Sequence, residues 1–165
     1  MILALSGSAT PGEDTWLIDS GASKHITGQR DILSCILENK FSQKVTLGDD
    51  YQYPIKGVGE SNHKLNSGNS LKIKDVLYVP GLTKNLLSIS ALEKKGFRVA
   101  FLDGEVLMWA KGETINEAIV IGNEENGLYK LKGHPETAMT HAIENSCKLW
   151  HRRLPHINYK ALPYV

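Results

Sequence analysis

The residues best suited to chemistry form the segment Asp19-Ser20-Gly21-Ala22, which directly follows the apolar run Trp16-Leu17-Ile18. The apolar run predicts a short buried strand. The segment after it predicts a tight turn, because glycine allows close backbone approach and backbone angles that other residues avoid. A carboxylate at the end of a strand, supported by a hydroxyl and two small residues, is suited to activating water. Asp19 is therefore the candidate catalytic residue, and the next three residues support its turn.

Peptide hydrolysis without a metal or a covalent intermediate requires two carboxylates that share one proton. The ionised carboxylate takes a proton from water and the protonated one polarises the carbonyl. The sequence holds only one Asp-Ser-Gly turn, so the simplest completion is a two-fold homodimer in which Asp19 of each copy meets on the axis. The alternative is a second aspartate in the same chain, such as Asp49, Asp75 or Asp103. Because Asp-Ser-Gly is also an ordinary turn, the segment alone does not establish an enzyme.

The elements that must position this turn are predicted to be mostly strands. Asp103-Gly104, Lys111-Gly112 and Asn126-Gly127 predict a run of hairpins. The helical spacing of leucine and isoleucine predicts a helix over Asn85–Lys95, and a longer helix is expected over 136–153. The fold class is therefore mostly β, a small closed barrel with one short helix and a C-terminal helical tail. The predicted strands are Thr15–Ile18, Lys44–Leu47, Tyr51–Val58, Leu71–Ile73, Val76–Val79, Phe97–Phe101, Val106–Trp109, Ala118–Ile121 and Leu128–Leu131.

The bulk composition is that of an ordinary globular protein. The chain has 165 residues, of which 41% are hydrophobic and 22% charged, with a net charge of +1. This charge argues against a dedicated binder of nucleic acid. The sequence has no apolar run of membrane-spanning length, and its apolar start is too short and uncharged for a signal peptide. We therefore expect an intracellular, cytoplasmic protein that does not bind membranes.

Four blocks together resemble the protease region of copia-type long-terminal-repeat retrotransposon polyproteins. The resemblance implies a retropepsin-like aspartic protease, active as a homodimer, that cleaves its own Gag-Pol polyprotein in cytoplasmic virus-like particles and needs no cofactor. It makes Asp19 the catalytic residue. It also implies a linker over 1–13, the protease over 14–101, a hairpin extension over 102–133 and a truncated integrase zinc segment over 134–165. The blocks are Trp16–His25, Val45–Asp49 with Pro54–Gly59, Asp75–Leu82 with Asn85–Ser88, and Lys148–Leu154.

The resemblance also implies a flap, a mobile hairpin over the substrate, within Tyr53–Ser61. Gly57 and Gly59 flank Val58, and alternating glycines let a strand bend. With Ile55, these residues are the candidate substrate-binding set. Whether the hairpin tip lies at Gly57–Gly59 or at Asp49–Gln52 stays open, and an ordinary twisted hairpin explains the glycines equally well.

The second part of the third block, Asn85–Ser88, resembles the buried strand that passes behind the catalytic loop in retropepsins. On that reading it precedes a helix and does not belong to one. Retroviral relatives often have glycine where this chain has Ser88. The leucines of the block are predicted to be core residues without a chemical role.

His151 and His156 have the spacing of two zinc ligands, and the resemblance implies half of an integrase zinc site. Structural zinc sites close with four ligands, so we expect zinc here only if the missing ligands are supplied. Pro155 stands where the family usually has glycine. Two alternatives to the enzyme remain: a catalytically silent dimeric scaffold that binds peptides, and a zinc or nucleic-acid module built on the tail. We rank the latter last, and we do not expect this chain to bind nucleic acid.

Overall fold

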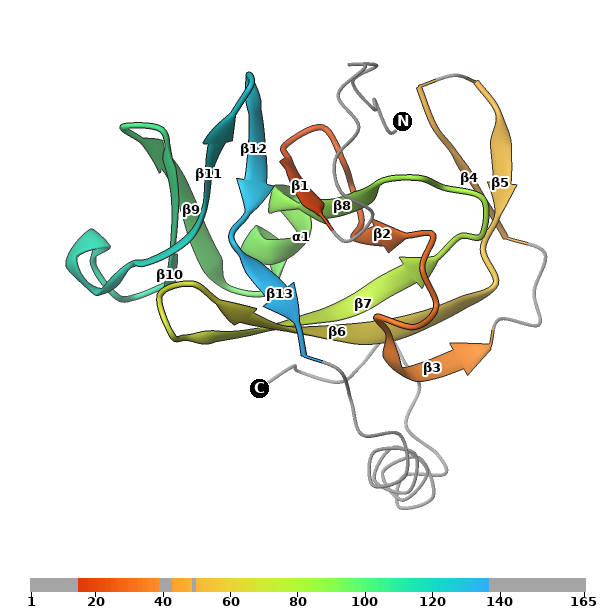
Figure 1. Ribbon diagram of the computed structural model, residues 1–165, viewed down its shortest axis with the longest axis horizontal. Helices are drawn as coiled ribbons and strands as arrows, with labels where there is room; N and C mark the ends of the chain where they lie inside the picture. The colour runs from red at the N-terminus through yellow and green to blue at the C-terminus, as the bar shows by residue number, and fades with distance from the viewer. Residues whose placement is uncertain (1–14, 39–42, 49, 137–165) are drawn as a thin grey trace.

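The computed structural model describes residues 15–38, 43–48 and 50–136, and these are mostly β-structure with one short α-helix (Figure 1). The predicted class of mostly β with one short helix is confirmed, whereas the predicted C-terminal helical tail lies outside the described residues. The elements in chain order are β1 (Trp16–Asp19), β2 (Ile26–Thr27), β3 (Ser34–Glu38), β4 (Lys44–Thr46), β5 (Gln52–Pro54), β6 (Gly57–Leu65), β7 (Ser70–Tyr78), β8 (Asn85–Ser88), α1 (Ile89–Lys94), β9 (Phe97–Leu102), β10 (Glu105–Ala110), the 3-10 helix η1 (Ile115–Glu117), β11 (Ile119–Glu125), β12 (Leu128–Leu131) and β13 (Gly133–Pro135).

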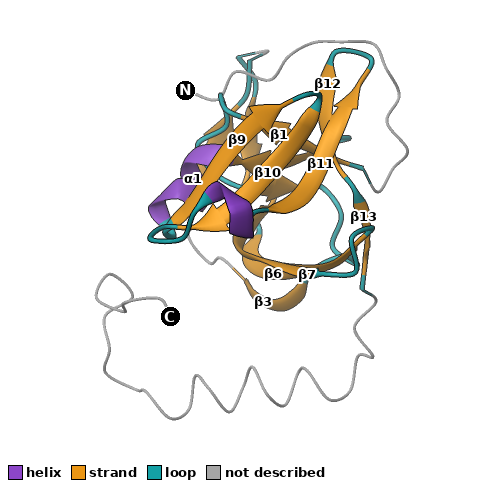
Figure 2. Cartoon of the chain, turned by 90° about the vertical axis from the view of Figure 1, so that its left-hand side faces the viewer, coloured by secondary structure: helices purple, strands orange, loops and turns teal. Residues whose placement is uncertain are grey.

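One large sheet organises the molecule, and it does not close into the barrel that we expected. Its strands run in the order β13-β6-β7-β2-β8-β1-β12-β11-β10-β9, with β3 added on β6, while β4 and β5 form a separate two-stranded sheet. Only Lys132 separates β12, which pairs with β1, from β13, which pairs with β6. The sheet therefore curls towards itself at this point. It stays open because β12 continues into a layer of β11, β10 and β9, beside which α1 lies (Figure 2).

Most of the predicted strands and two of the three predicted hairpin turns are confirmed. Asp103 and Gly104 have φ values of 51° and 79°, and Asn126 and Gly127 have values of 52° and 75°. Two successive residues with positive φ are what a two-residue hairpin of type I′ requires. The third hairpin has a longer connection, because η1 lies between β10 and β11. The two predicted strands of 71–79 are a single strand, β7.

The helix predicted over Asn85–Lys95 is wrong in its first four residues, which form the buried strand β8 as the family resemblance implied. Leu86 and Leu87 belong to different hydrophobic clusters. A strand covered on both faces needs consecutive apolar residues, and such a run imitates the start of an apolar helix. The helix α1 begins only at Ile89, after Ser88 has capped it by accepting a hydrogen bond from the Ala91 N–H.

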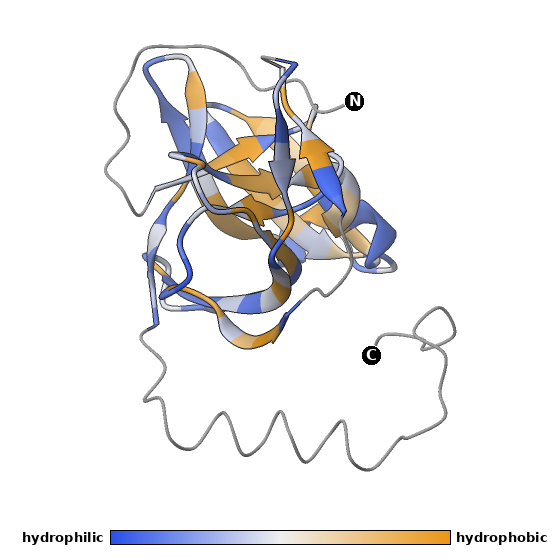
Figure 3. Ribbon diagram, turned by 90° about the vertical axis from the view of Figure 1, so that its right-hand side faces the viewer, coloured by the Kyte–Doolittle hydropathy of each residue, from blue (hydrophilic) through white to orange (hydrophobic). Residues whose placement is uncertain are grey.

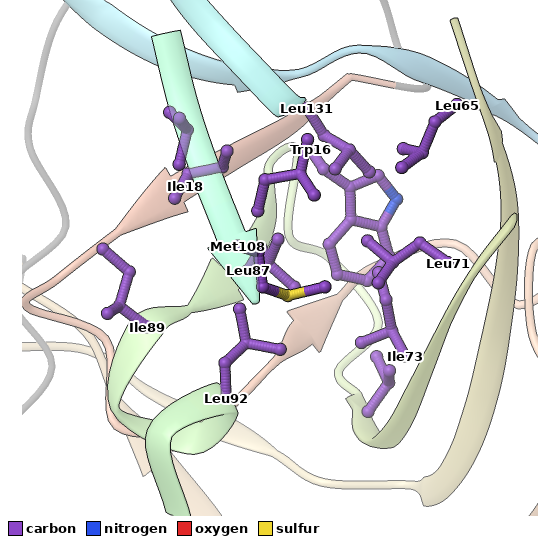
Figure 4. Packing of buried hydrophobic residues seen from close by; sticks show 13 residues of the cluster. Trp16, Ile18, Leu65, Leu71, Ile73, Leu87, Ile89, Leu92, Met108 and Leu131 are labelled. Atoms are coloured by element: carbon purple, nitrogen blue, oxygen red, sulfur yellow. The ribbon is translucent and has the colours of Figure 1, made fainter. Parts of the chain in front are cut away.

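The core consists of two hydrophobic clusters on opposite faces of the central strands β1 and β8. Trp16 and Ile18 point into the larger cluster and Leu17 into the smaller, because side chains alternate along a strand. The Trp16 indole lies between the side chains of β6, β7 and β12 (Figure 4). The hydropathy colouring shows apolar residues gathered on the central strands and polar residues more frequent at the periphery (Figure 3).

The segment after residue 101 shares this core with the segment before it. The predicted boundary between 101 and 102 falls inside β9. The larger cluster combines Trp16 and Leu87 with Val106, Ile121 and Leu131, all of them buried. The hairpin extension over 102–133 is therefore packed on the same body as the segment 15–101. No helix in the described ranges is long and apolar enough to span a membrane.

Candidate active site

Asp19 is the last residue of β1, where the chain leaves the sheet for the turn predicted from the sequence. β1 runs parallel to β8, and the register places Asp19 opposite Ser88. The Asp19 Oδ1 atom accepts a hydrogen bond of 2.7 Å from the Gly21 N–H, which closes an Asx turn. Asp19 is half-buried, Ser20 and Gly21 are exposed, and Ala22 is buried. The carboxylate is thus presented at the surface by a turn whose far end is fixed inside the molecule.

Two serine hydroxyls from the start of α1 hold the buried end of this turn. The Ser88 Oγ donates to the Ala22 carbonyl at 2.6 Å, and the Ser90 Oγ donates to the same oxygen at 3.2 Å. The Ser88 Oγ also accepts from the Ala91 N–H at 3.1 Å, so one hydroxyl caps the helix and anchors the turn. Ser88 is therefore connected directly to the Asp19 turn.

His25 ends the segment that begins at Asp19 and lies buried behind it. Its Nδ1 accepts a hydrogen bond of 3.0 Å from the Ser88 N–H, so the proton of the neutral ring is on Nε2. Burial lowers the pKa of His25 from 6.5 to about 4; Lys95 and Lys24 lower it further and Asp75 opposes them. At neutral pH the imidazole is uncharged and acts as an acceptor for the backbone of β8.

Of the other candidate aspartates, the structure describes Asp75 and Asp103, and it does not pair either of them with Asp19. Ser88, and not an acid, stands opposite Asp19 in the neighbouring strand. Asp75 lies in β7, where its Oδ2 atom is 2.9 Å from the Nζ of Lys95. Asp103 lies in the turn between β9 and β10, and Asp49 is outside the described residues. Among the aspartates that the structure describes, Asp19 alone ends a central strand in a small-residue turn.

The hairpin of β4 and β5 forms a two-stranded sheet separate from the large sheet (Figure 1). Its turn lies between Thr46 and Gln52, the second of the two tip positions left open by the sequence. Val45, Leu47 and Ile55 of this hairpin and its base are buried in the smaller cluster, which also holds Ala22 of the Asp19 turn. The base of the hairpin and the buried end of the turn therefore rest on the same apolar contacts.

Gly57 and Gly59 do not form a hairpin tip. They lie at the start of the long strand β6, which pairs with β3 on one side and β7 on the other. A Cβ atom at Gly57 would lie 2.9 Å from the Ile36 Cγ2, and one at Gly59 would lie 3.0 Å from the Ser34 carbonyl oxygen. Close packing against β3 therefore explains these glycines, and Val58 between them is half-buried.

The candidate zinc ligands His151 and His156 lie outside the described residues. Within the described ranges no group of three or more histidine, cysteine, aspartate or glutamate side chains is placed to hold a metal ion.

Comparisons with known proteins agree with the blocks recognised in the sequence. Residues 16–97 match the family model described as the beta-barrel domain of the Pol polyprotein. The chain is 31% identical over 152 residues to the retrovirus-related Pol polyprotein from transposon TNT 1-94 of Nicotiana tabacum, an alignment that covers 91% of this chain and 11% of that protein. The similarity to copia-type retrotransposon Pol polyproteins is therefore confirmed.

Two further relatives extend this similarity. The Pol polyprotein from transposon RE1 of Arabidopsis thaliana is 28% identical over 154 residues, covering 87% of this chain and 10% of that protein. The one from transposon RE2 of the same plant is 39% identical over 85 residues, covering 48% of this chain and 5% of that protein. The chain thus corresponds to about a tenth of the length of the first two Pol relatives. No solved structure matches it.

Sequence reasoning found Asp19 and its turn but missed His25 and Ser90 as parts of this site. A serine before an apolar helical run is a recognised N-cap signal, so Ser88 could have been assigned that role. No local pattern connects residues 22 and 25 with residue 88. That connection exists only because β1 and β8 are neighbours in the sheet.

Proposed function

We propose that this part of the Pol polyprotein is an aspartic endopeptidase that works as a homodimer, with Asp19 from each copy. The observation that carries the proposal is the single carboxylate presented by the Asx turn at the end of β1, next to Ser88 in the neighbouring strand. One such turn supplies half of the pair that metal-free peptide hydrolysis needs. A second copy supplies the other half through a two-fold axis.

The reaction follows from two carboxylates that hold one proton between them. The ionised carboxylate takes a proton from water while the oxygen of that water adds to the carbonyl carbon of the peptide. The protonated carboxyl group gives its proton to the carbonyl oxygen. When the tetrahedral intermediate collapses, the C–N bond breaks and the amine nitrogen takes the proton that the first carboxyl group received from water. One hydroxyl of the intermediate returns its proton to the second carboxylate as the carboxylic acid product forms. The pair of carboxyl groups ends the cycle with one proton, as it began.

In this proposal the β4–β5 hairpin covers the substrate, and Gly57–Gly59 belong to the frame beneath it. The hairpin forms its own small sheet, and its base contacts the same cluster as Ala22. A cover of this kind excludes water other than the nucleophile from the two carboxylates. The substrate proposed is a polyprotein segment in extended form.

The test is cleavage of peptides that span the junctions of the parent polyprotein by the wild-type chain and by Asp19→Asn. The substitution keeps the size of the side chain and its acceptor for the Gly21 N–H but removes the ionisable group. We expect cleavage to fall by at least about a thousandfold, since neither general acid nor general base remains. Activity that survives in Asp19→Asn would remove the proposal. Peptide binding without turnover by the wild-type chain would favour the silent scaffold.

A further inference from the structure

The segment from Asp19 to His25 is attached to one residue, Ser88, at three points. At its start, Asp19 stands opposite Ser88 in the β1–β8 ladder. In its middle, the Ala22 carbonyl accepts from the Ser88 hydroxyl at 2.6 Å. At its end, the Nδ1 of His25 accepts from the Ser88 N–H at 3.0 Å. The path of the turn that carries Asp19 is therefore set by where Ser88 lies.

Of these three attachments, only the one at His25 is made by a side chain of the segment from Asp19 to His25. His25 is 1% exposed and Ser88 is 0% exposed, so this hydrogen bond lies out of contact with solvent. A buried N–H without an acceptor is unfavourable, and the backbone of β8 would shift to satisfy it. Because Ser88 also holds Ala22, a shift at Ser88 is passed directly to the Asp19 turn.

The chemistry of a carboxylate pair makes such a shift important. Two carboxyl groups share a proton only at a fixed short separation, and a displacement of about 1 Å can reduce the rate of a positioned reaction about a hundredfold. A turn has no regular ladder of hydrogen bonds to hold that separation, so side chains must supply the support. In this turn the support comes from Ser88, Ser90 and His25.

We infer that His25 is a positioning residue for Asp19, acting through Ser88 to fix the turn in the geometry that the carboxylate pair requires. This inference rests on the proposed function for its effect on catalysis. It concerns the imidazole of His25 and not the two carboxylates themselves.

The structure offers a matched control in His63. His63 is also 1% exposed, but it lies in β6, where its Nε2 bonds the Ser61 hydroxyl at 2.9 Å and its ring contacts Trp16 edge-on. A purely structural role predicts that removal of either imidazole acts only through stability. A positioning role predicts that removal of His25 acts on the chemical step as well.

The experiment compares His25→Leu, His25→Asn and His63→Leu with the wild-type homodimer, at a temperature at which each is fully folded. In His25→Leu the acceptor is lost, and we expect kcat to fall about tenfold to a hundredfold with KM changed less than about twofold. In His25→Asn the Oδ1 atom takes the place of Nδ1, and kcat should recover to within about threefold of wild type. His63→Leu should keep its kcat. A kcat that is unchanged in His25→Leu, or equally reduced in His63→Leu, would overturn the inference.

A second readout separates this inference from the proposed enzyme. The amide signals of Gly21 and Ala22 in a heteronuclear NMR spectrum report the turn without requiring catalysis. Displacement of these signals in His25→Leu but not in His63→Leu supports the positioning role, and unchanged signals overturn it. If the wild-type chain cleaves no junction peptide, or Asp19→Asn cleaves as well as wild type, the enzyme proposal fails while the amide signals still decide the role of His25.

Discussion

His25 and His63 are buried to the same degree in two regions of the molecule that are held together differently. His25 lies behind the Asp19 turn and accepts a hydrogen bond from the backbone of β8. His63 lies in β6, where it meets the Ser61 hydroxyl, and that hydroxyl also donates to the Ile32 carbonyl at 3.1 Å. The Trp16 ring packs against His63 with 5.4 Å between the ring centroids. One imidazole thus satisfies a backbone donor, whereas the other bonds a side-chain hydroxyl and packs against Trp16.

The difference teaches how the chain path is fixed in each region. Around His63 the long ladder between β6 and β7 holds the backbone, so the side chain adds packing to an element that is already defined. Around His25 the backbone leaves the sheet in a turn, and hydrogen bonds from Ser88 and Ser90 replace the ladder. We therefore expect the first region to respond to substitution mainly in stability and the second in both stability and function.

The largest expected effect is the loss of stability in acid, which both histidines share. Burial lowers the pKa of each from 6.5 to about 4, with His134 adding to the effect at His63. The unfolded chain therefore takes up protons below pH 6.5 that the folded chain refuses. The stability due to the two neutral rings is complete above pH 6.5 and is lost as the pH falls towards 4, by roughly 3 kcal/mol for each histidine.

Urea denaturation between about pH 7.5 and about pH 4.5 measures this loss. Replacing either histidine by leucine should remove about half of the pH dependence, because each ring contributes a similar share. A free energy of unfolding that stays constant across this interval would show that the imidazoles are not buried as neutral rings.

The next largest effect is a difference in unfolding free energy between the His25 and His63 variants at neutral pH. His25→Leu leaves the Ser88 N–H buried without its acceptor, whereas His63→Leu leaves only a hydroxyl that can still donate to the Ile32 carbonyl. We expect His25→Leu to lower the free energy of unfolding by about 1–2 kcal/mol more than His63→Leu does. Equilibrium denaturation of the two variants at neutral pH provides the comparison. Equal losses would mean that the two regions do not differ in the way described.

The smallest expected effect concerns the two serine hydroxyls that bond the Ala22 carbonyl at the end of the Asp19 turn. Ser90→Ala removes the weaker of the two hydroxyl bonds to the Ala22 carbonyl, at 3.2 Å, and leaves the Ser88 bond in place. We expect a loss of about 0.5–1 kcal/mol in unfolding free energy and almost no change in cleavage. Ser88→Ala, which removes the helix cap as well as the stronger bond, should lose about 2 kcal/mol. A larger loss of unfolding free energy in Ser90→Ala than in Ser88→Ala would contradict the assignment of Ser88 as the main anchor of the turn.

Much of the fold could be predicted from local sequence. Asp103-Gly104 and Asn126-Gly127 predict their hairpins, because few other residue pairs adopt the two positive φ values of a type I′ turn. The apolar run before Asp19 announces a strand buried on both faces, and β1 is that strand. The small residues after Asp19 predict the turn that follows β1. The position of the candidate catalytic residue at the end of a strand could therefore be predicted from the sequence.

The features that could not be predicted from the sequence depend on contacts between distant segments. A run such as Leu86-Leu87 is compatible with a strand or a helix, and only its place between two clusters makes it β8. Gly57 and Gly59 look like a flexible hinge, but they are small because β3 packs against them. The hairpin of β11 and β12 was predictable, but no local pattern indicates that β12 also pairs with β1. His25 is a lone histidine until β8 is placed beside it.

The most direct test of the central claim, that each chain supplies one carboxylate of a shared pair, is to mix wild-type chains with an equal amount of Asp19→Asn chains. The mixture is allowed to exchange partners, and cleavage is measured at a fixed total concentration well above that needed for dimerisation. If both copies must contribute Asp19, only wild-type pairs are active, and the rate should fall to about a quarter of that of the pure wild-type sample. A rate of about one half, proportional to the wild-type chains present, would contradict the account, because each chain would then carry a complete site.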